Sequence, residues 1–232
     1  MAPRLVLWDI DGTLVNSGGV GAEVFDLAIE RTLGIRPATR PTMSGKTDPQ
    51  IVREYLAMLE VAEDEVLVHL DTVLGHLAAA LAASEGEVRR RGTVLPGVEA
   101  ALGRLAAAPE VVQTVLTGNV AANAAVKLGA FGLDRWLDLE VGAFGSDHAD
   151  RSRLVPVAVG RVAKRRGRRF EPDQVWVVGD SANDLACARA SGARCLLVGT
   201  GGAAIGELEA LGPDAVLPDL ADADHAVGLL LS

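Results

Sequence analysis

Residues 5–14, which read LVLWDIDGTL, are the stretch that decides the fold. A short apolar run, of the length of a buried strand, ends there at two carboxylates, Asp9 and Asp11. Residues two apart in an extended segment point to the same side, so the two charges would lie close together. At about 4 Å, two like charges repel by ~1 kcal/mol in water and ~4 kcal/mol at an effective dielectric of about 20. The pattern therefore favours a cation beside them, and a hard dication such as Mg²⁺ suits oxygen ligands best.

Two further apolar strands are predicted, over residues 111–116 and 175–178, and each also ends in polar residues. The residues that follow are Thr117, Gly118 and Asn119 after the first, and Gly179, Asp180 and then Asp184 after the second. Open parallel sheets bind ligands beyond the carboxyl ends of their strands, so all three loops could line one crevice. Each loop alone has a plainer interpretation, as an Asp-Gly turn or a helix cap. The combination, each loop directly after a buried strand, favours a functional site.

The pattern of elements divides the chain in two. Short apolar runs alternate with helical patterns over residues 93–232, which predicts a parallel sheet with helices on both faces. One of these runs predicts a weaker strand over 137–141. Residues 16–92 show helical patterns and no convincing strand. We therefore expect an α/β, Rossmann-like, doubly wound parallel core over 1–15 and 93–232, with an inserted α-helical cap over 16–92.

The three motifs together resemble those of the haloacid dehalogenase-like (HAD) hydrolase superfamily. They read DIDGTL from Asp9, LTGN ending at Asn119, and VVGDSAND ending at Asp184. The helical insertion after the first motif is similar to the phosphoglycolate-phosphatase-like branch. The resemblance implies Mg²⁺-dependent hydrolysis of a small phosphomonoester, phosphoglycolate-like or a sugar phosphate, through an aspartyl-phosphate intermediate.

The resemblance also implies roles for the acidic residues. Asp9 would be the nucleophile, and Asp11 the general acid for the leaving alkoxide and then the base for the hydrolytic water. Mg²⁺ would be held by the Asp9 carboxylate, the Asp11 main-chain carbonyl and Asp180. Asp184 would act on the metal directly or through a bound water.

Phosphate binding is implied at the second motif and at a basic residue further on. Thr117 and the backbone N–H groups of Gly118 and Asn119 would hold the phosphoryl oxygens. The family also expects a Lys or Arg ahead of the helix before the last motif, often as Lys-Pro, which this chain lacks. Arg151 is our choice and Arg153 the alternative, because a guanidinium can clamp phosphate or carboxylate with two hydrogen bonds.

Two other stretches look like nucleotide-binding motifs. Gly45-Lys46-Thr47 lacks the earlier glycine of a P-loop, since position 40 is Arg40, and no strand precedes it. By resemblance it belongs to the cap, where Lys46 and Thr47 are candidate specificity contacts; a helix cap at Thr47 is the equal alternative. Residues 199–204, GTGGAA, match a dinucleotide fingerprint after a strand, but too little chain follows for a nucleotide fold.

Net charge, cysteine spacing and the length of apolar runs limit the kinds of molecule that this protein could bind. The 232 residues carry a formal charge of −9, which argues against nucleic acid or an anionic membrane as the main partner. The two cysteines have no spacing typical of a metal site, and no apolar run approaches a membrane span or a signal peptide. We expect a cytoplasmic protein that binds a small phosphorylated metabolite; the ester itself and the oligomeric state stay open.

Two alternatives to a phosphatase remain. A phosphomutase would use the same Asp nucleophile and return the phosphoryl group to its product. A catalytically silent phospho-ligand binding module is the other, and the presence of both Asp9 and Asp11 argues against it.

Overall fold

A computed structural model describes residues 3–232, and its centre is a five-stranded sheet in which every pair of neighbours runs parallel. The strands, in spatial order, are β4 (Val111–Val115), β1 (Arg4–Trp8), β5 (Val175–Gly179), β6 (Arg194–Val198) and β7 (Ala215–Leu217). In β1, Leu7 lies opposite Thr114 on one side and Val177 on the other, so the three strands end together. The predicted Rossmann-like parallel core is confirmed.

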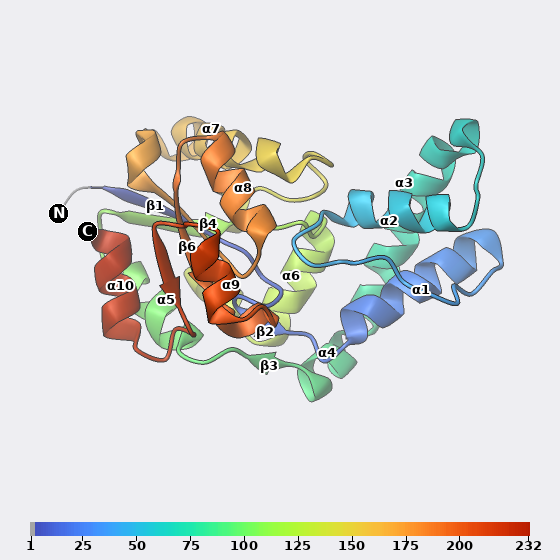
Figure 1. Ribbon diagram of the computed structural model, residues 1–232, viewed down its shortest axis with the longest axis horizontal. Helices are drawn as coiled ribbons and strands as arrows, with labels where there is room; N and C mark the ends of the chain where they lie inside the picture. Colours follow the sequence, from blue (N-terminus) through green and yellow to red (C-terminus); the bar gives the residue numbers. More distant parts are fainter. Residues whose placement is uncertain (1–2) are drawn as a thin grey trace.

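Helices cover both faces of the sheet (Figure 1). One face packs on α5 (Val98–Ala106), α6 (Ala121–Ala130) and α10 (Ala223–Leu231), and the other on α7 (Leu154–Arg166), α8 (Ala182–Ala190) and α9 (Ile205–Ala210). Side chains alternate between the two faces along a strand. In β1, Val6 and Trp8 therefore enter the first layer and Leu5 and Leu7 the second, and all four are fully buried.

A separate helical unit lies beyond the carboxyl edge of the sheet, on the right in Figure 1. It consists of α1 (Val20–Leu33), α2 (Asp48–Met58), α3 (Glu63–Ala83) and α4 (Glu85–Arg91). These helices share an apolar cluster, to which Phe25, Tyr55 and Leu77 belong and which Ala130 of α6 joins. The chain enters and leaves the unit through β2 (Val15–Asn16) and β3 (Thr93–Val94), which pair antiparallel.

Helix α3 is the one helix of residues 3–232 that is long and apolar enough, by length and composition alone, to cross a membrane. It begins with three acidic residues, and Leu70, Val73 and Leu77 are buried within the helical unit. Leu67 and Val68 of the same helix are exposed.

The strand predicted over 137–141 is wrong. A 3₁₀ helix, Leu139–Val141, lies in this segment, and another, Leu133–Trp136, ends just before it. The segment does run beside β4, because the Asp138 N–H donates to the Gln113 carbonyl and the Thr114 hydroxyl donates to the Asp138 carbonyl. A hydrogen bond from the Thr114 side chain thus replaces part of the backbone pairing that a strand would make with β4. Beyond the end of β4, an isolated β-bridge joins Leu116 to Ala143.

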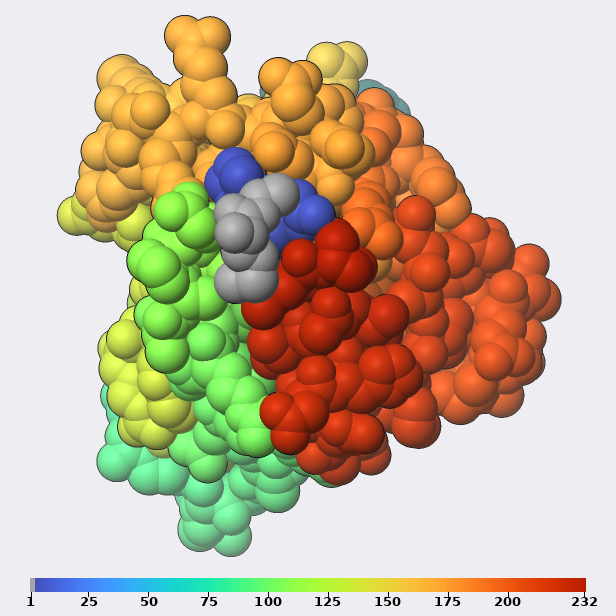
Figure 2. All heavy atoms as spheres, turned by 90° about the vertical axis from the view of Figure 1, so that its left-hand side faces the viewer, coloured from blue at the N-terminus to red at the C-terminus, as the bar shows by residue number. Residues whose placement is uncertain are grey.

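The end of the molecule opposite the helical unit is closed by protein. Figure 2 shows the start of β1, in blue, between the orange segment of α7 and the red α10. The guanidinium groups of Arg4 and Arg194 both donate to the Ser232 carbonyl, which ties α10 to this edge. Access to the sheet is therefore at its carboxyl edge, under the helical unit.

Candidate active site

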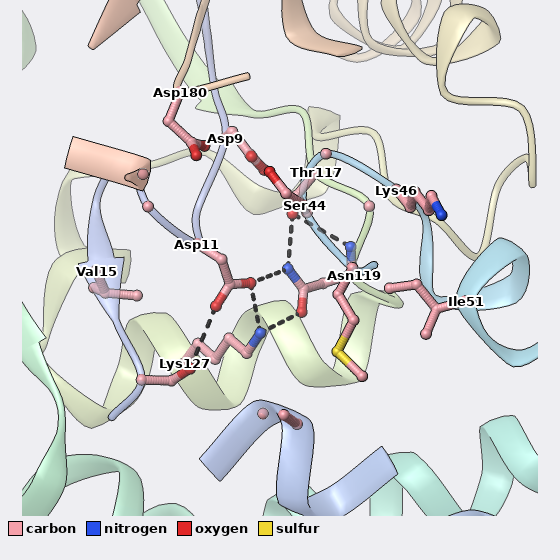
Figure 3. Close-up of a pocket in the computed structure, with 18 of the residues that line it drawn as sticks. Asp9, Asp11, Val15, Ser44, Lys46, Ile51, Thr117, Asn119, Lys127 and Asp180 are labelled. Carbon is pink, nitrogen blue, oxygen red and sulfur yellow. Dashed lines mark hydrogen bonds and ion pairs between the residues drawn. The ribbon is translucent and has the colours of Figure 1, made fainter. Parts of the chain in front are cut away.

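A cavity of about 350 Å³ lies between the carboxyl edge of the sheet and the helical unit (Figure 3). The core contributes Asp9, Asp11, Thr117, Asn119, Arg151 and Asp180 to its lining, and the helical unit contributes Phe25, Met43, Lys46 and Ile51. Loops that are far apart in the chain thus share one space, as the three sequence motifs predict.

Three carboxylates gather beside this cavity, and two of them, Asp9 and Asp180, line it. Asp9 follows β1, Asp180 follows β5, and Asp184 lies in the first turn of α8. Oxygen atoms of the three lie within 4.8 Å of one another, and all three residues are buried. Burial first, and then the charges of its carboxylate neighbours, raise the pKa of Asp9 to about 6 and that of Asp180 to about 8. The nearby Arg151 charge opposes both shifts.

This donor set fits a hard divalent cation. Three buried carboxylates face one guanidinium, so the cluster has excess negative charge and offers only oxygen ligands. The Asp184 carboxylate already accepts hydrogen bonds from the Ser181 hydroxyl (2.6 Å) and N–H (3.1 Å), and from Arg151. Asp9 and Asp180 therefore have more oxygen atoms free for a metal.

Arg151, from the short helix Arg151–Arg153, is the basic residue of this cluster. Its Nη2 lies 3.1 Å from Asp9 Oδ2 and also bonds Asp184. Its Nε is buried with no hydrogen-bond partner in residues 3–232, which leaves a donor for a phosphoryl oxygen. Arg153, the alternative candidate, is exposed. The geometry favours Arg151, whose role in phosphate binding stays a prediction.

The loop after β4 is pressed against the helical unit. The Thr117 hydroxyl accepts hydrogen bonds from the N–H (3.3 Å) and the side-chain amide (2.8 Å) of Asn119. A Cβ at Gly118 would lie 2.0 Å from the Lys46 carbonyl, so only glycine allows this approach. The loop that we expect to hold phosphate therefore also forms the seam with the helical unit.

Comparison with protein families matches residues 6–189 to the haloacid dehalogenase-like hydrolases. The chain belongs to this family. No curated protein matches the sequence.

Solved structures of similar fold cover almost the whole chain of this family member. A hydrolase from Pseudomonas syringae has a TM-score of 0.70 at 19% identity, covering 97% of this chain and 98% of the other. CbbY from Rhodobacter sphaeroides, in complex with phosphate, gives 0.69 at 17% identity, covering 95% and 96%. A predicted phosphoglycolate phosphatase from Haemophilus somnus gives 0.64 at 21% identity, covering 96% and 97%. At these identities the likeness shows the fold alone.

Sequence reasoning missed Lys127 of this HAD hydrolase. Its Nζ lies 2.5 Å from Asp11 Oδ2 and 2.7 Å from Asn119 Oδ1 (Figure 3). Burial would raise the pKa of Asp11, but the Lys127 charge and the hydrogen bonds from Lys127, Asn119 and Ser17 outweigh it and lower that pKa. Lys127 is the one charged residue of the alanine-rich α6, and this was the signal available in the sequence.

The glycine-rich turn after β6 was also missed as part of the site. Gly199–Gly201 form a 3₁₀ turn, and the Thr200 hydroxyl donates to the Gly12 carbonyl. A Cβ on Gly201 would lie 1.6 Å from Asp180 Oδ2. The stretch that resembles a dinucleotide fingerprint thus packs directly on the acidic cluster.

The two candidate specificity residues have different places. Lys46 lines the cavity, but its Nζ pairs with Glu54 at 2.6 Å, and in Figure 3 its side chain points away from Asp9. Thr47 caps α2, accepting from the Gln50 N–H at 3.3 Å, and its hydroxyl donates to the Ala149 carbonyl at 2.7 Å. Thr47 therefore caps its helix and also joins the helical unit to the core, and of the two residues only Lys46 lines the cavity.

Proposed function

We propose that this hydrolase is a Mg²⁺-dependent phosphatase that cleaves a small phosphomonoester, phosphoglycolate-like or a sugar phosphate, through an aspartyl-phosphate. One observation carries the proposal: the buried Asp9 faces the cavity between a second carboxylate, Asp180, and a guanidinium, Arg151. The names of the similar structures, a phosphoglycolate phosphatase and a protein in complex with phosphate, support the same class of substrate.

In the first step an Asp9 oxygen forms a bond to phosphorus while the bond from phosphorus to the leaving oxygen breaks. The departing alkoxide takes a proton from Asp11 and leaves as the alcohol. Arg151, the Thr117 hydroxyl and the Gly118 N–H would hold the non-bridging oxygens in this step.

In the second step Asp11 takes a proton from water as the water oxygen bonds to phosphorus. The bond between Asp9 and phosphorus then breaks, which releases phosphate and leaves Asp11 protonated for the next cycle. A Mg²⁺ held by Asp9, the Asp11 carbonyl and Asp180, with Asp184 directly or through water, would neutralise charge on the phosphoryl group.

We propose that residues 16–92, which contain the helical unit, act as a cap. Phe25, Met43 and Ile51 give the cavity an apolar wall opposite the carboxylates. Such a wall would exclude bulk water, which strengthens electrostatic interactions within the site.

We expect the protein in the cytoplasm, because both of its cysteines are free and buried.

The test is phosphate release from a panel of small phosphate esters with Mg²⁺, for the wild type and for Asp9→Asn. The substitution keeps the shape of the side chain but removes the nucleophilic oxygen, so we expect turnover to fall by about 10³-fold or more. Retained turnover in a folded Asp9→Asn protein would refute the mechanism. Isomerised sugar phosphate without free phosphate would indicate a mutase, and ligand binding without any turnover a silent binding module.

A further inference from the structure

We infer that Lys127 is a positioning residue that sets which oxygen of Asp11 exchanges the proton with the leaving group. The inference rests on the proposed function, in which Asp11 is the general acid. Lys127 lies on α6, outside all three family motifs.

The contacts of Asp11 differ between its two oxygen atoms. Oδ2 accepts from Lys127 Nζ at 2.5 Å and from the Asn119 side-chain amide at 2.8 Å. Oδ1 has only a 3.5 Å contact with the Ser17 hydroxyl. Two strong donors on one oxygen fix the rotation of the carboxyl group and leave Oδ1 as the atom available to the leaving oxygen.

Lys127 is a buried cation whose hydrogen-bond partners are polar groups of the site, Asp11 and Asn119. Its side chain is 7% exposed, and a buried ammonium is costly without a partner. An apolar residue would pack in an alanine-rich helix without that cost. Lys127 is also not the cation of the acidic cluster, because Arg151 pairs with Asp9 and Asp184.

Contacts of α6 with its neighbours fix the position of Lys127 relative to Asp11. Asn123, one turn earlier on the same face, donates to Asp48 Oδ2 of the helical unit at 3.1 Å. Asn119 Oδ1, which accepts from Nζ at 2.7 Å, gives the ammonium a second anchor. The lysine thus connects the acid, the loop after β4 and a helix joined to the helical unit.

The test compares two substrates of similar size that differ in the need for a general acid. p-Nitrophenyl phosphate releases a stable phenolate, whereas benzyl phosphate releases an alkoxide that requires a proton. For Lys127→Met we expect kcat/KM on benzyl phosphate to fall about 10- to 100-fold, and on p-nitrophenyl phosphate by less than about threefold. Lys164→Met, at an exposed lysine near the end of α7, is the matched control and should leave both values unchanged.

Each other outcome has a distinct meaning. An equal loss on both substrates would show that Lys127 only supports the site, and no loss on either would show that Asp11 needs no such anchor; both overturn the inference. A wild type inactive on both esters, and on the wider panel, would instead refute the proposed function. If Lys127→Met does not fold, Lys127→Gln is assayed in the same way. Its uncharged side chain is one bond shorter and cannot reach both acceptors, so the same selective loss is expected.

Discussion

At Gly201 the backbone of the turn after β6 comes so close to the acidic cluster that a single methyl group would displace Asp180, which we propose as a metal ligand. The Cβ of an alanine there would lie 1.6 Å from Asp180 Oδ2, closer than any real contact. We expect Asp180 to move, because the three atoms nearest to that position all belong to its side chain. We expect Gly201→Ala to fold and to bind Mg²⁺ about 10- to 100-fold more weakly, as for other residues that orient a metal ligand.

The measurement is the Mg²⁺ concentration that gives half-maximal phosphate release. Gly206→Ala is the matched control, because a Cβ on this residue of α9 meets no atom within 4 Å and alanine favours a helix. An unchanged Mg²⁺ requirement in Gly201→Ala would mean that Asp180 is not a ligand, or that the turn gives way instead.

Residue-scale prediction from sequence succeeds where a residue directly follows a buried strand. Asp9 and Asp180 could be placed together because parallel strands end at one edge of the sheet. Lys127 and Gly201 could not, since their contacts depend on how α6 and the turn after β6 pack on those strand ends. Local spacing carries no information about that packing.

At the scale of elements, the junction between α2 and α6 depends on one buried carboxylate. Asp48, the first residue of α2, accepts from the Val120 N–H at 2.8 Å and from the Asn123 amide at 3.1 Å. Burial is the largest influence and raises the pKa of Asp48 to about 6, although the Lys127 charge and these hydrogen bonds oppose the rise.

This shift predicts how stability at the junction depends on pH. The folded-state pKa of Asp48 lies above its unfolded value, so its favourable contribution is complete below pH ~4 and is lost as pH rises through about 6. An asparagine stays neutral and can keep a hydrogen bond to Val120. Between pH 4 and 7 we expect the free energy of unfolding of Asp48→Asn to gain up to about 3 kcal/mol relative to wild type, at 1.36 kcal/mol for each pKa unit.

Urea unfolding of both proteins at several pH values measures this difference. Because the two share every other titrating group, the acid sensitivity of the rest of the chain cancels in the comparison. Parallel stability profiles across this range would show that Asp48 ionises in the folded state as easily as in the unfolded chain.

Most helices and strands could be predicted from sequence, but the two strands of two residues could not. Periodicity predicts α8 and β7 with the bounds that the structure has. It does not indicate β2 and β3, since strands of two residues have no period to detect. It predicts a strand over 137–141, where apolar residues alternate with Asp138 and Glu140 as in a strand. The structure has a 3₁₀ helix from Leu139, and the Thr114 hydroxyl donates to the Asp138 carbonyl just before it.

At the scale of the whole molecule, the helical unit and the sheet have largely separate apolar clusters and meet both at the cavity and along α6. Three mutually repelling carboxylates at the sheet edge do not help such a fold to form. Their proximity, with the pKa of Asp9 near 6 and that of Asp180 near 8, is a cost to the metal-free protein. A dication that binds only the folded state would offset that cost and join loops distant in the chain.

Mg²⁺ should therefore stabilise the whole protein. At about 100 times its dissociation constant, a ligand that binds only the folded state contributes ~2.7 kcal/mol, which in a chain of this size raises Tm by about 5–10 °C. Above about pH 8, where wild-type Asp180 is ionised, we expect two opposite effects of Asp180→Asn: a higher Tm without metal, because one repelling charge is gone, and loss of most of the Mg²⁺ response. Thermal unfolding with Mg²⁺, with EDTA, and with NaCl of equal ionic strength separates metal binding from screening. A Mg²⁺ shift of the same size in both proteins would mean that the ion binds elsewhere, and the acidic cluster would then need another explanation.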